Sequence, residues 1–145
     1  MRRRRFSPFS ASFLSSARFD ACSAESARDR IRRLMREIVL DTETTGLDPK
    51  DGHRIVEIAC IELQNHLPTG RFFHRYINPQ REMTADALLV HGLDDAFLAQ
   101  HPPFANQVEA FIEFVADAPL VIHNAEFDLA FINAELKRLG RAALA

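Results

Sequence analysis

The amino-acid sequence has no tryptophan, one tyrosine and only two cysteines among its 145 residues. Cys22 and Cys60 are too few for the disulfide framework that holds many small secreted domains together, so the cysteine content fits a reducing compartment. No apolar run approaches the roughly 18 residues that a membrane-spanning helix needs. These absences argue against a secreted disulfide scaffold and against a membrane protein, and we expect no membrane partner.

The overall composition is that of an ordinary globular chain. Hydrophobic residues make up 47% of the sequence and charged residues 26%, and twelve phenylalanines supply enough bulk for one core. At this length the chain forms one domain at most.

The net charge of −2 is divided unevenly along the chain. Residues 1–38 carry a net charge of +6 and residues 39–145 a net charge of −8. A protein that binds nucleic acid by neutralising phosphates is normally basic, which this second part is not. An enzyme that holds only a chain end, and in which divalent metals supply the positive charge, can remain acidic. The charge therefore does not decide between a nucleic-acid binder and a metal-dependent enzyme that holds a chain end.

The first 34 residues form a basic, serine-rich segment. A basic arm for nucleic acid, a transit peptide and an export signal with paired arginines all share this composition. Met35 directly precedes the first predicted strand, which also allows translation to start there. We expect residues 1–34 to be an extension that is disordered or that results from a misassigned start.

The pattern of the remaining sequence predicts an α/β fold. Turn-forming residues cluster at 48–52 and 68–70, and three successive strands with short links predict an antiparallel meander. A long helix between strands predicts that the fourth strand is parallel to its neighbour, which gives a mixed sheet flanked by helices. The first predicted strand begins at Ile38 and is ended by Gly46, and the other predicted strands are 55–63, 72–77 and 120–122. The predicted helices are 83–90, 102–117 and 125–139, and Gly140 caps the last of them.

Two acidic residues stand at the end of the first strand. Side chains on a strand alternate between its faces, so Asp41 and Glu43 project from the same side, about 6 to 7 Å apart. Two carboxylates so placed repel each other, and protonation, a basic neighbour or a bound cation relieves the repulsion. The spacing suits a pair of divalent cations that cleaves phosphodiesters. The alternative is an acidic strand end that faces water.

A third acid lies in the last helix. Asp128 shares one stripe with Phe131, Ile132 and Glu135, because residues three and four apart lie on the same helix face. An acid on an apolar stripe points toward the sheet. It can interact with the N-terminus of its own helix, or it can join Asp41 and Glu43 as a metal-binding carboxylate.

The sequence resembles the DEDD-type 3′→5′ exonucleases, which have the ribonuclease H-like fold. The resemblance extends from Met35 to about Leu139. Within the family, the likeness is greatest to the proofreading epsilon subunits of bacterial DNA polymerase III. It rests on the order and spacing of four segments: Asp41-Thr42-Glu43-Thr44-Thr45-Gly46, Val90-His91-Gly92-Leu93, Pro103-Phe104 and His123-Asn124-Ala125-Glu126-Phe127-Asp128.

The resemblance implies both the site and the activity. It assigns metal-binding and catalytic roles to Asp41, Glu43 and Asp128, with two Mg²⁺ or Mn²⁺ ions. It assigns nucleotide contacts to Asp41, Glu43, His91 and Asp86, the last being one methylene shorter than the usual glutamate. The implied function is removal of mismatched nucleotides from DNA 3′ ends in the cytoplasm, with the polymerase catalytic subunit and other replisome subunits as partners.

One motif of the family is absent from the sequence. The third motif, His-Ala-x-x-x-Asp, supplies a general-base histidine and a fourth acid, and no such sequence occurs before Ala145. We therefore expect residues 35–145 to be the N-terminal part of an exonuclease domain, with a fold incomplete at the C-terminus and no activity on its own. A stand-alone RNA or single-strand exonuclease and a catalytically silent binding module are the alternatives.

Overall fold

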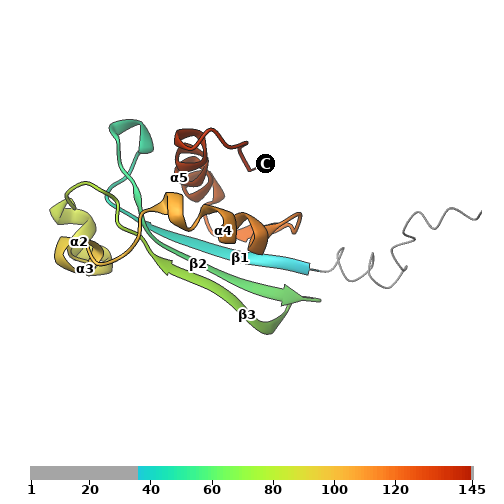
Figure 1. The fold of residues 1–145 in the computed structure, drawn as a ribbon. Coiled ribbons are helices and arrows are strands. Elements are labelled where there is room, and N and C mark those ends of the chain that lie inside the picture. The colour runs from blue at the N-terminus through green and yellow to red at the C-terminus, as the bar shows by residue number, and fades with distance from the viewer. Residues whose placement is uncertain (1–35, 145) are drawn as a thin grey trace, which may run out of the picture.

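The computed structural model describes residues 36–144, which form one four-stranded sheet with helices (Figure 1). The strand order is β3-β2-β1-β4. β1 pairs with β2 and β2 with β3 in antiparallel fashion, whereas β4 is parallel to β1, which confirms the predicted mixed sheet. The strands are β1 Arg36–Thr44, β2 Ile55–Gln64, β3 Leu67–Tyr76 and β4 Leu120–Ile122. The predicted extension, residues 1–34, lies outside the described residues.

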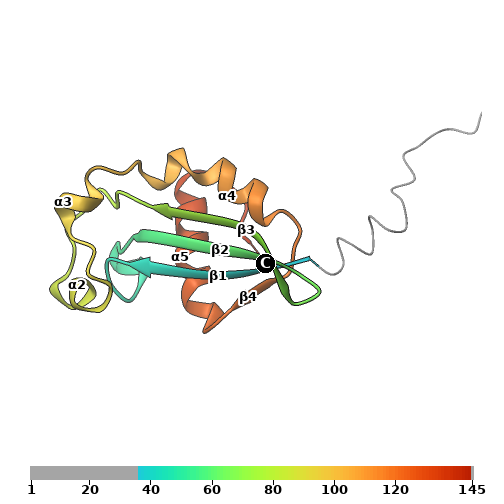
Figure 2. The ribbon, with the colours of Figure 1, turned by 90° about the horizontal axis from the view of Figure 1, so that it is seen from below.

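The longer helices cover one face of this sheet. Figure 1 shows α4 and α5 above the strands, and Figure 2, seen from below, shows the strands in front of α5. α2 and α3 lie at the end of the sheet where β1 ends. None of the helices in the described part of the chain is long and apolar enough to cross a membrane. The helices are α2 Ala85–His91, α3 Asp95–Leu98, α4 Val108–Val115 and α5 Ala125–Arg138, with 3₁₀ turns η1 Pro49–Asp51 and η2 Phe104–Asn106.

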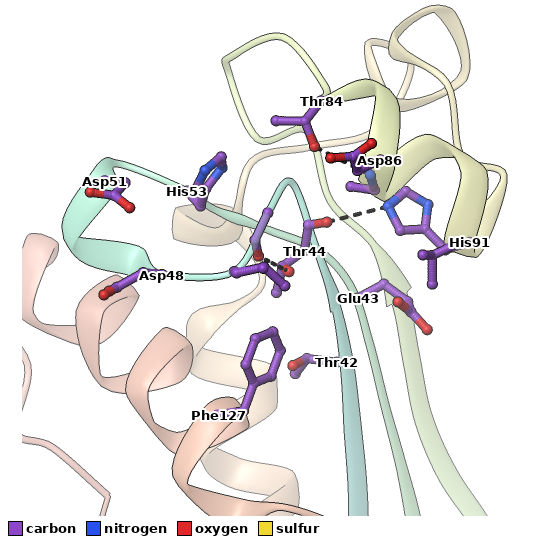
Figure 3. A pocket seen from close by; sticks show the side chains of 14 residues that line it. Thr42, Glu43, Thr44, Asp48, Asp51, His53, Thr84, Asp86, His91 and Phe127 are labelled. Carbon is purple, nitrogen blue, oxygen red and sulfur yellow. Dashed lines mark hydrogen bonds between the residues drawn. The ribbon is translucent and has the colours of Figure 1, made fainter.

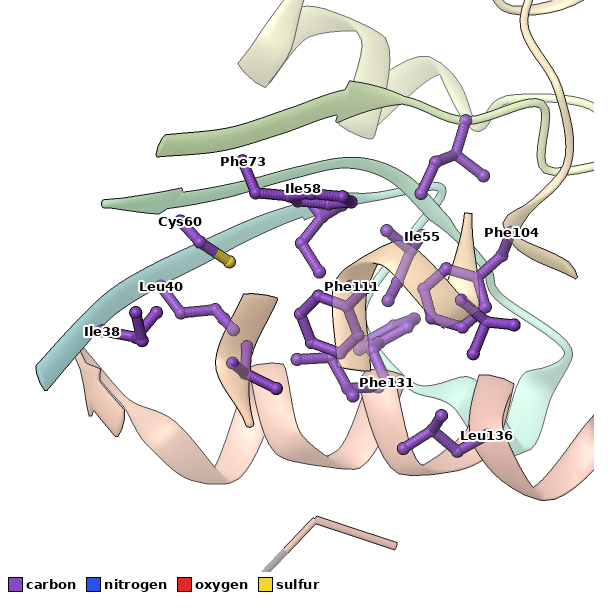
Figure 4. Close-up of a cluster of buried hydrophobic side chains, with 14 residues drawn as sticks. Ile38, Leu40, Ile55, Ile58, Cys60, Phe73, Phe104, Phe111, Phe131 and Leu136 are labelled. Atoms are coloured by element: carbon purple, nitrogen blue, oxygen red, sulfur yellow. The ribbon is translucent and has the colours of Figure 1, made fainter. Parts of the chain in front are cut away.

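Strand alternation decides which side chains enter the core. On β1, Ile38 and Leu40 are buried beneath the helices, while Asp41 is exposed on the opposite face. The core lies between the sheet and the helices α4 and α5 (Figure 4). Its main members are Ile38, Leu40, Ile55, Ile58, Cys60, Phe73, Phe104, Phe111, Phe131, Ile132 and Leu136.

The face of the sheet opposite α4 and α5 is called the open face below. An apolar row crosses it at one level, because Val39 pairs with Ile61 and Val121, and Ile61 pairs with Phe72. Phe72 is 70% exposed, and Ile61 and Val121 are exposed as well. One level beyond Asp41, Glu43 of β1 stands directly opposite Glu57 of β2. The open face is thus apolar at the level of Val39 and acidic toward the end of β1.

The predicted turn at residues 68–70 is wrong. The chain reverses at Asn65 and His66, which have φ values of 55° and 61°, and β3 begins at Leu67. Two residues with positive φ close a two-residue hairpin whose twist matches that of the strands. Pro68 is tolerated inside β3 because this strand lies at the edge of the sheet.

The three predicted helices are found at their predicted positions, but some of their terminal residues differ. The segment after Pro103 begins with the 3₁₀ turn η2, and α4 itself starts at Val108 and ends at Val115, two residues before the predicted end. The short helix α3 was not predicted. α5 was predicted well: it ends at Arg138, and Gly140 follows in the left-handed conformation with a φ of 67°.

Candidate active site

β1 presents two carboxylates on the open face. Asp41 pairs with Ala59 and Glu43 with Glu57 in a regular antiparallel register, which shifts only after Glu43. Because both residues lie on the same face of one strand, the predicted alternation is confirmed. Asp41 is exposed and Glu43 is half-buried.

α5 brings the third carboxylate to β1. Asp128 lies in the first turn of α5 and is only 3% exposed. The hydroxyl of Thr42 donates a hydrogen bond of 2.7 Å to Oδ1 of Asp128. Thr42 lies between Asp41 and Glu43 but faces the helices, so Asp128 reaches β1 from the helix side of the sheet. The prediction that Asp128 points inward is confirmed.

The carboxylates affect each other's ionisation. Burial raises the pKa of Glu43 above its ordinary value; nearby His91 opposes this shift, and the charges of Asp41, Glu57 and Asp128 add to it. Burial also raises the pKa of Asp128, against the hydrogen bond from Thr42, and the charge of Asp41 raises it further. Both carboxylates are therefore harder to ionise than in water. A bound cation would reverse this effect.

The carboxylates of Asp41, Glu43 and Asp128 are suitable ligands for a divalent metal ion. Their arrangement does not form a complete coordination site. Carboxylate oxygens are the ligands that Mg²⁺ and Mn²⁺ prefer. Between residues 36 and 144, however, no three His, Cys, Asp or Glu side chains are arranged so that they could hold a metal ion. Asp41 and Glu43 approach from the open face and Asp128 from the helix side, so the assignment of these three residues as metal ligands stays a prediction.

A cavity of about 430 Å³ lies between the end of β1 and α2 (Figure 3). Glu43 and the two predicted nucleotide contacts Asp86 and His91 line it, whereas Asp41 and Asp128 are not among its lining residues. The walls combine acids with apolar side chains. They include Thr42, Glu43, Gly46, Leu47, Asp48, Asp51, His53, Thr84, Asp86, Val90, His91 and Phe127.

His91 is held at the end of α2 by two hydrogen bonds. Gly92 follows it with a φ of 74°, which lets the chain leave the helix. The backbone N–H of Leu93 donates to Nδ1 of His91 at 3.1 Å. Since Nδ1 accepts, the ring carries its proton on Nε2, and this N–H donates to the carbonyl oxygen of Thr44 at 3.3 Å.

Thr84 connects the start of α2 to the turn after β1. Its side chain caps the helix by accepting from the N–H of Ala87, and its hydroxyl donates to the carbonyl oxygen of Thr45 at 2.9 Å. Asp86 lies in the first turn of α2 and is exposed. Both ends of α2 are therefore fixed to the Thr44–Gly46 turn, which places Asp86 and His91 beside the end of β1.

Four residues of this site are not predicted from the sequence. Strand alternation could have identified Thr42, because it faces the helix that carries Asp128. No spacing rule identifies Thr84 or Phe127. His53 follows a turn and has no motif around it, yet its ring packs against Gly46: a Cβ atom at Gly46 would lie only 2.3 Å from Cε1 of His53.

Comparison with known proteins shows which family and which fold this chain is similar to. Residues 38–145 match the sequence model of the exonuclease family RNase_T. DNA polymerase III subunit epsilon of Rickettsia felis is 54% identical over 110 residues, which cover 76% of this chain and 48% of that protein. The chain therefore spans about half the length of the curated relatives it matches.

Solved exonuclease structures show the same fold at low sequence identity. The nuclease domain of 3'hExo, a DEDDh family member bound to rAMP, has a TM-score of 0.63 at 16% identity; the match covers 74% of this chain and 61% of that one. Exonuclease I from Methylocaldum szegediense has a TM-score of 0.65 at 22% identity, over 71% of this chain and 23% of that one. The predicted ribonuclease H-like sheet is confirmed by these neighbours.

Proposed function

The chain belongs to the exonuclease family, and on this premise we propose that it forms part of a 3′→5′ exonuclease that removes mismatched nucleotides from DNA 3′ ends. A relative that is 54% identical over 110 aligned residues is named DNA polymerase III subunit epsilon, which favours a proofreading subunit of a replicative polymerase. The polymerase catalytic subunit and other replisome subunits are the proposed partners, and the cytoplasm is the proposed location.

One observation carries the proposal. Asp41 and Glu43 stand on one face of β1, and Asp128 is hydrogen-bonded to Thr42 between them. We assign Asp41, Glu43 and Asp128 as the residues that hold two Mg²⁺ or Mn²⁺ ions. When bound, divalent cations supply an ionised water and stabilise the charge that develops on a phosphodiester. Thr42 keeps the Asp128 carboxylate directed toward β1.

The cavity beside these acids is the proposed site for the terminal nucleotide. His91 and Asp86 line it together with Glu43, and α2 positions both of them against the end of β1. A mismatched end unpairs at less cost than a matched one, so it reaches such a site as a single strand more often. The lower cost of unpairing therefore favours the removal of mismatched ends.

Metal binding gives the most direct test. We expect the 145-residue chain to bind Mn²⁺, measured by calorimetry, and to lose this binding in Asp41→Asn, Glu43→Gln and Asp128→Asn. Glu113 is an exposed acid on α4, so Glu113→Gln is the matched control and keeps the wild-type affinity. Equal Mn²⁺ affinity in all four variants would contradict the assignment.

Substrate choice separates proofreading from the alternatives. The 145 residues contain no His-Ala-x-x-x-Asp sequence, so we expect them to release little nucleotide by themselves. Binding of single-stranded DNA and RNA of the same sequence is therefore compared, in the presence of Mn²⁺. A clear preference for RNA would favour a stand-alone RNA exonuclease. Efficient release of nucleotides by the 145 residues alone would exclude the silent binding module.

A further inference from the structure

His53 lies in the loop before β2 and has no role in the site described so far. Its ring lines the cavity that also holds Glu43, Asp86 and His91 (Figure 3). The ring packs against the backbone of Gly46, where the space for a Cβ atom is filled by the imidazole. Only glycine at position 46 leaves room for this contact, so the turn after β1 and the His53 ring fit each other.

The hydrogen bonds of Thr45 determine which ring nitrogen of His53 carries the proton. The Thr45 side chain is fully buried, and its Oγ1 lies 3.0 Å from Nδ1 of His53. The backbone N–H of Arg54 donates to the same Oγ1 at 3.1 Å. The hydroxyl proton still needs an acceptor, and among the described residues Nδ1 of His53 is the one within reach. Nδ1 therefore accepts, and the proton of the neutral ring is on Nε2.

The Nε2–H group of His53 is thus a donor with no hydrogen-bond partner within residues 36–144. The acids Glu43, Asp48, Asp51 and Asp86 line the same cavity and would repel a phosphate. An acidic and partly apolar cavity suits the uncharged part of a nucleotide instead, since the sugar and the bases carry acceptors for a neutral N–H donor.

We propose that His53 is a further substrate-binding residue, whose Nε2–H donates a hydrogen bond to the sugar or base of the terminal nucleotide. This inference rests on the proposed function, because it needs a nucleotide in the cavity. Thr45 acts as its positioning residue: the hydroxyl fixes the tautomer and the orientation of the ring. Every nucleotide offers an acceptor to an uncharged N–H group. Such a contact therefore suits an exonuclease that does not select a sequence.

The affinity of the 145-residue chain for thymidine monophosphate in the presence of Mn²⁺ tests the contact. Loss of one hydrogen bond predicts binding about fivefold weaker in His53→Ala. His66 lies at the exposed β2–β3 hairpin, so His66→Asn is the matched control and binds as tightly as wild type. If His53→Ala also binds as tightly, the inference is wrong while the proposed function stands. If the wild-type chain binds no nucleotide, the proposed function fails and the inference fails with it.

Nuclear magnetic resonance of the ¹⁵N-labelled imidazole rings tests the geometry without a variant. We expect His53 of the wild-type chain to show the tautomer protonated at Nε2, and its Nε2 resonance to move when thymidine monophosphate is added. The resonances of His66 should remain in place. A ring protonated at Nδ1, or an Nε2 resonance that does not respond to the bound nucleotide, would overturn the proposal.

Discussion

The hydroxyl of Thr42 in β1 donates a hydrogen bond of 2.7 Å to Oδ1 of Asp128 in α5, and this bond joins the two segments that carry the predicted acids. It also satisfies a carboxylate that is almost completely buried. The bond lowers the pKa of Asp128, but burial and the charge of Asp41 outweigh it, so the carboxyl group titrates above its ordinary value.

This raised pKa predicts a pH-dependent loss of stability in the absence of metal. Above the ordinary Asp value of 3.8, the folded protein holds a proton on Asp128 more tightly than the unfolded chain does. The free energy of unfolding therefore falls as the pH rises through the folded pKa, and the loss is complete above it. Urea denaturation is expected to show Asp128→Asn to be more stable than wild type at pH 7, with the advantage of the variant shrinking as the pH falls toward 3.8.

The same experiment with Mn²⁺ links stability to the site. A cation that binds the folded wild-type chain stabilises it, whereas Asp128→Asn gains less. Glu113→Gln removes an exposed charge. It should leave the free energy of unfolding unchanged both at pH 7 and at low pH. If Asp128→Asn is no more stable than wild type at pH 7 without metal, the prediction is wrong.

The ion pair of Arg54 and Glu135 is expected to be important for stability. Nε and Nη2 of Arg54 bind the two carboxylate oxygens of Glu135 at 2.5 and 2.8 Å, and Glu135 is 2% exposed. The pair joins the start of β2, next to His53, to α5. Arg54→Ala leaves the buried Glu135 carboxylate with Arg138, 3.2 Å away, as its remaining ion-pair partner. We therefore expect a loss of stability below the roughly 3 to 5 kcal/mol that an uncompensated buried charge costs.

Thermal and urea unfolding of Arg54→Ala check this expectation. Arg141 forms a similar pair with Glu109, but both side chains are largely exposed. Because exposed pairs contribute about 0 to 1 kcal/mol, Arg141→Ala should lie close to wild type. Equal stability of the two variants would show that the buried pair contributes no more than the surface pair.

Strand and helix periodicity predicted the part of the site that depends on local sequence. The alternation along β1 placed Asp41 and Glu43 on one face, and the helical stripe placed Asp128 toward the sheet. Contacts between distant segments could not be predicted in this way. The packing of His53 on Gly46, for example, depends on how the loop between β1 and β2 returns to the sheet. The β2–β3 turn was missed because Asn65 and His66 include no glycine, while Pro68 to Gly70 have the stronger turn composition.

The thiol of Cys60 is expected to be inert in the folded chain. It lies in β2 on the core side of the sheet, and burial raises its pKa to about 12. The thiolate is the reactive form, so iodoacetamide at pH 8 should not modify Cys60 until the chain unfolds in urea. The measurement is made in Cys22→Ser by mass spectrometry. Modification of Cys60 in the native state at the rate of a free thiol would contradict the burial of this side of β2.

The open face of the sheet exposes a large apolar side chain. Phe72 and Phe73 are neighbours on β3 but face opposite sides, and they are 70% and 5% exposed. Phe72 belongs to the apolar row with Val39, Ile61 and Val121, so the folded chain is expected to bind the dye ANS at this face.

Phe72→Ser should weaken the binding of ANS and change the free energy of unfolding by less than about 0.5 kcal/mol, because an exposed ring loses little by removal. Phe73→Ser is the matched control: its ring packs against Phe111 in the core, and removal of a buried phenylalanine costs about 3 to 5 kcal/mol. If Phe72→Ser destabilises the chain as much as Phe73→Ser does, the face is covered in solution. A covered face would require a contact that the structure of residues 36–144 does not contain.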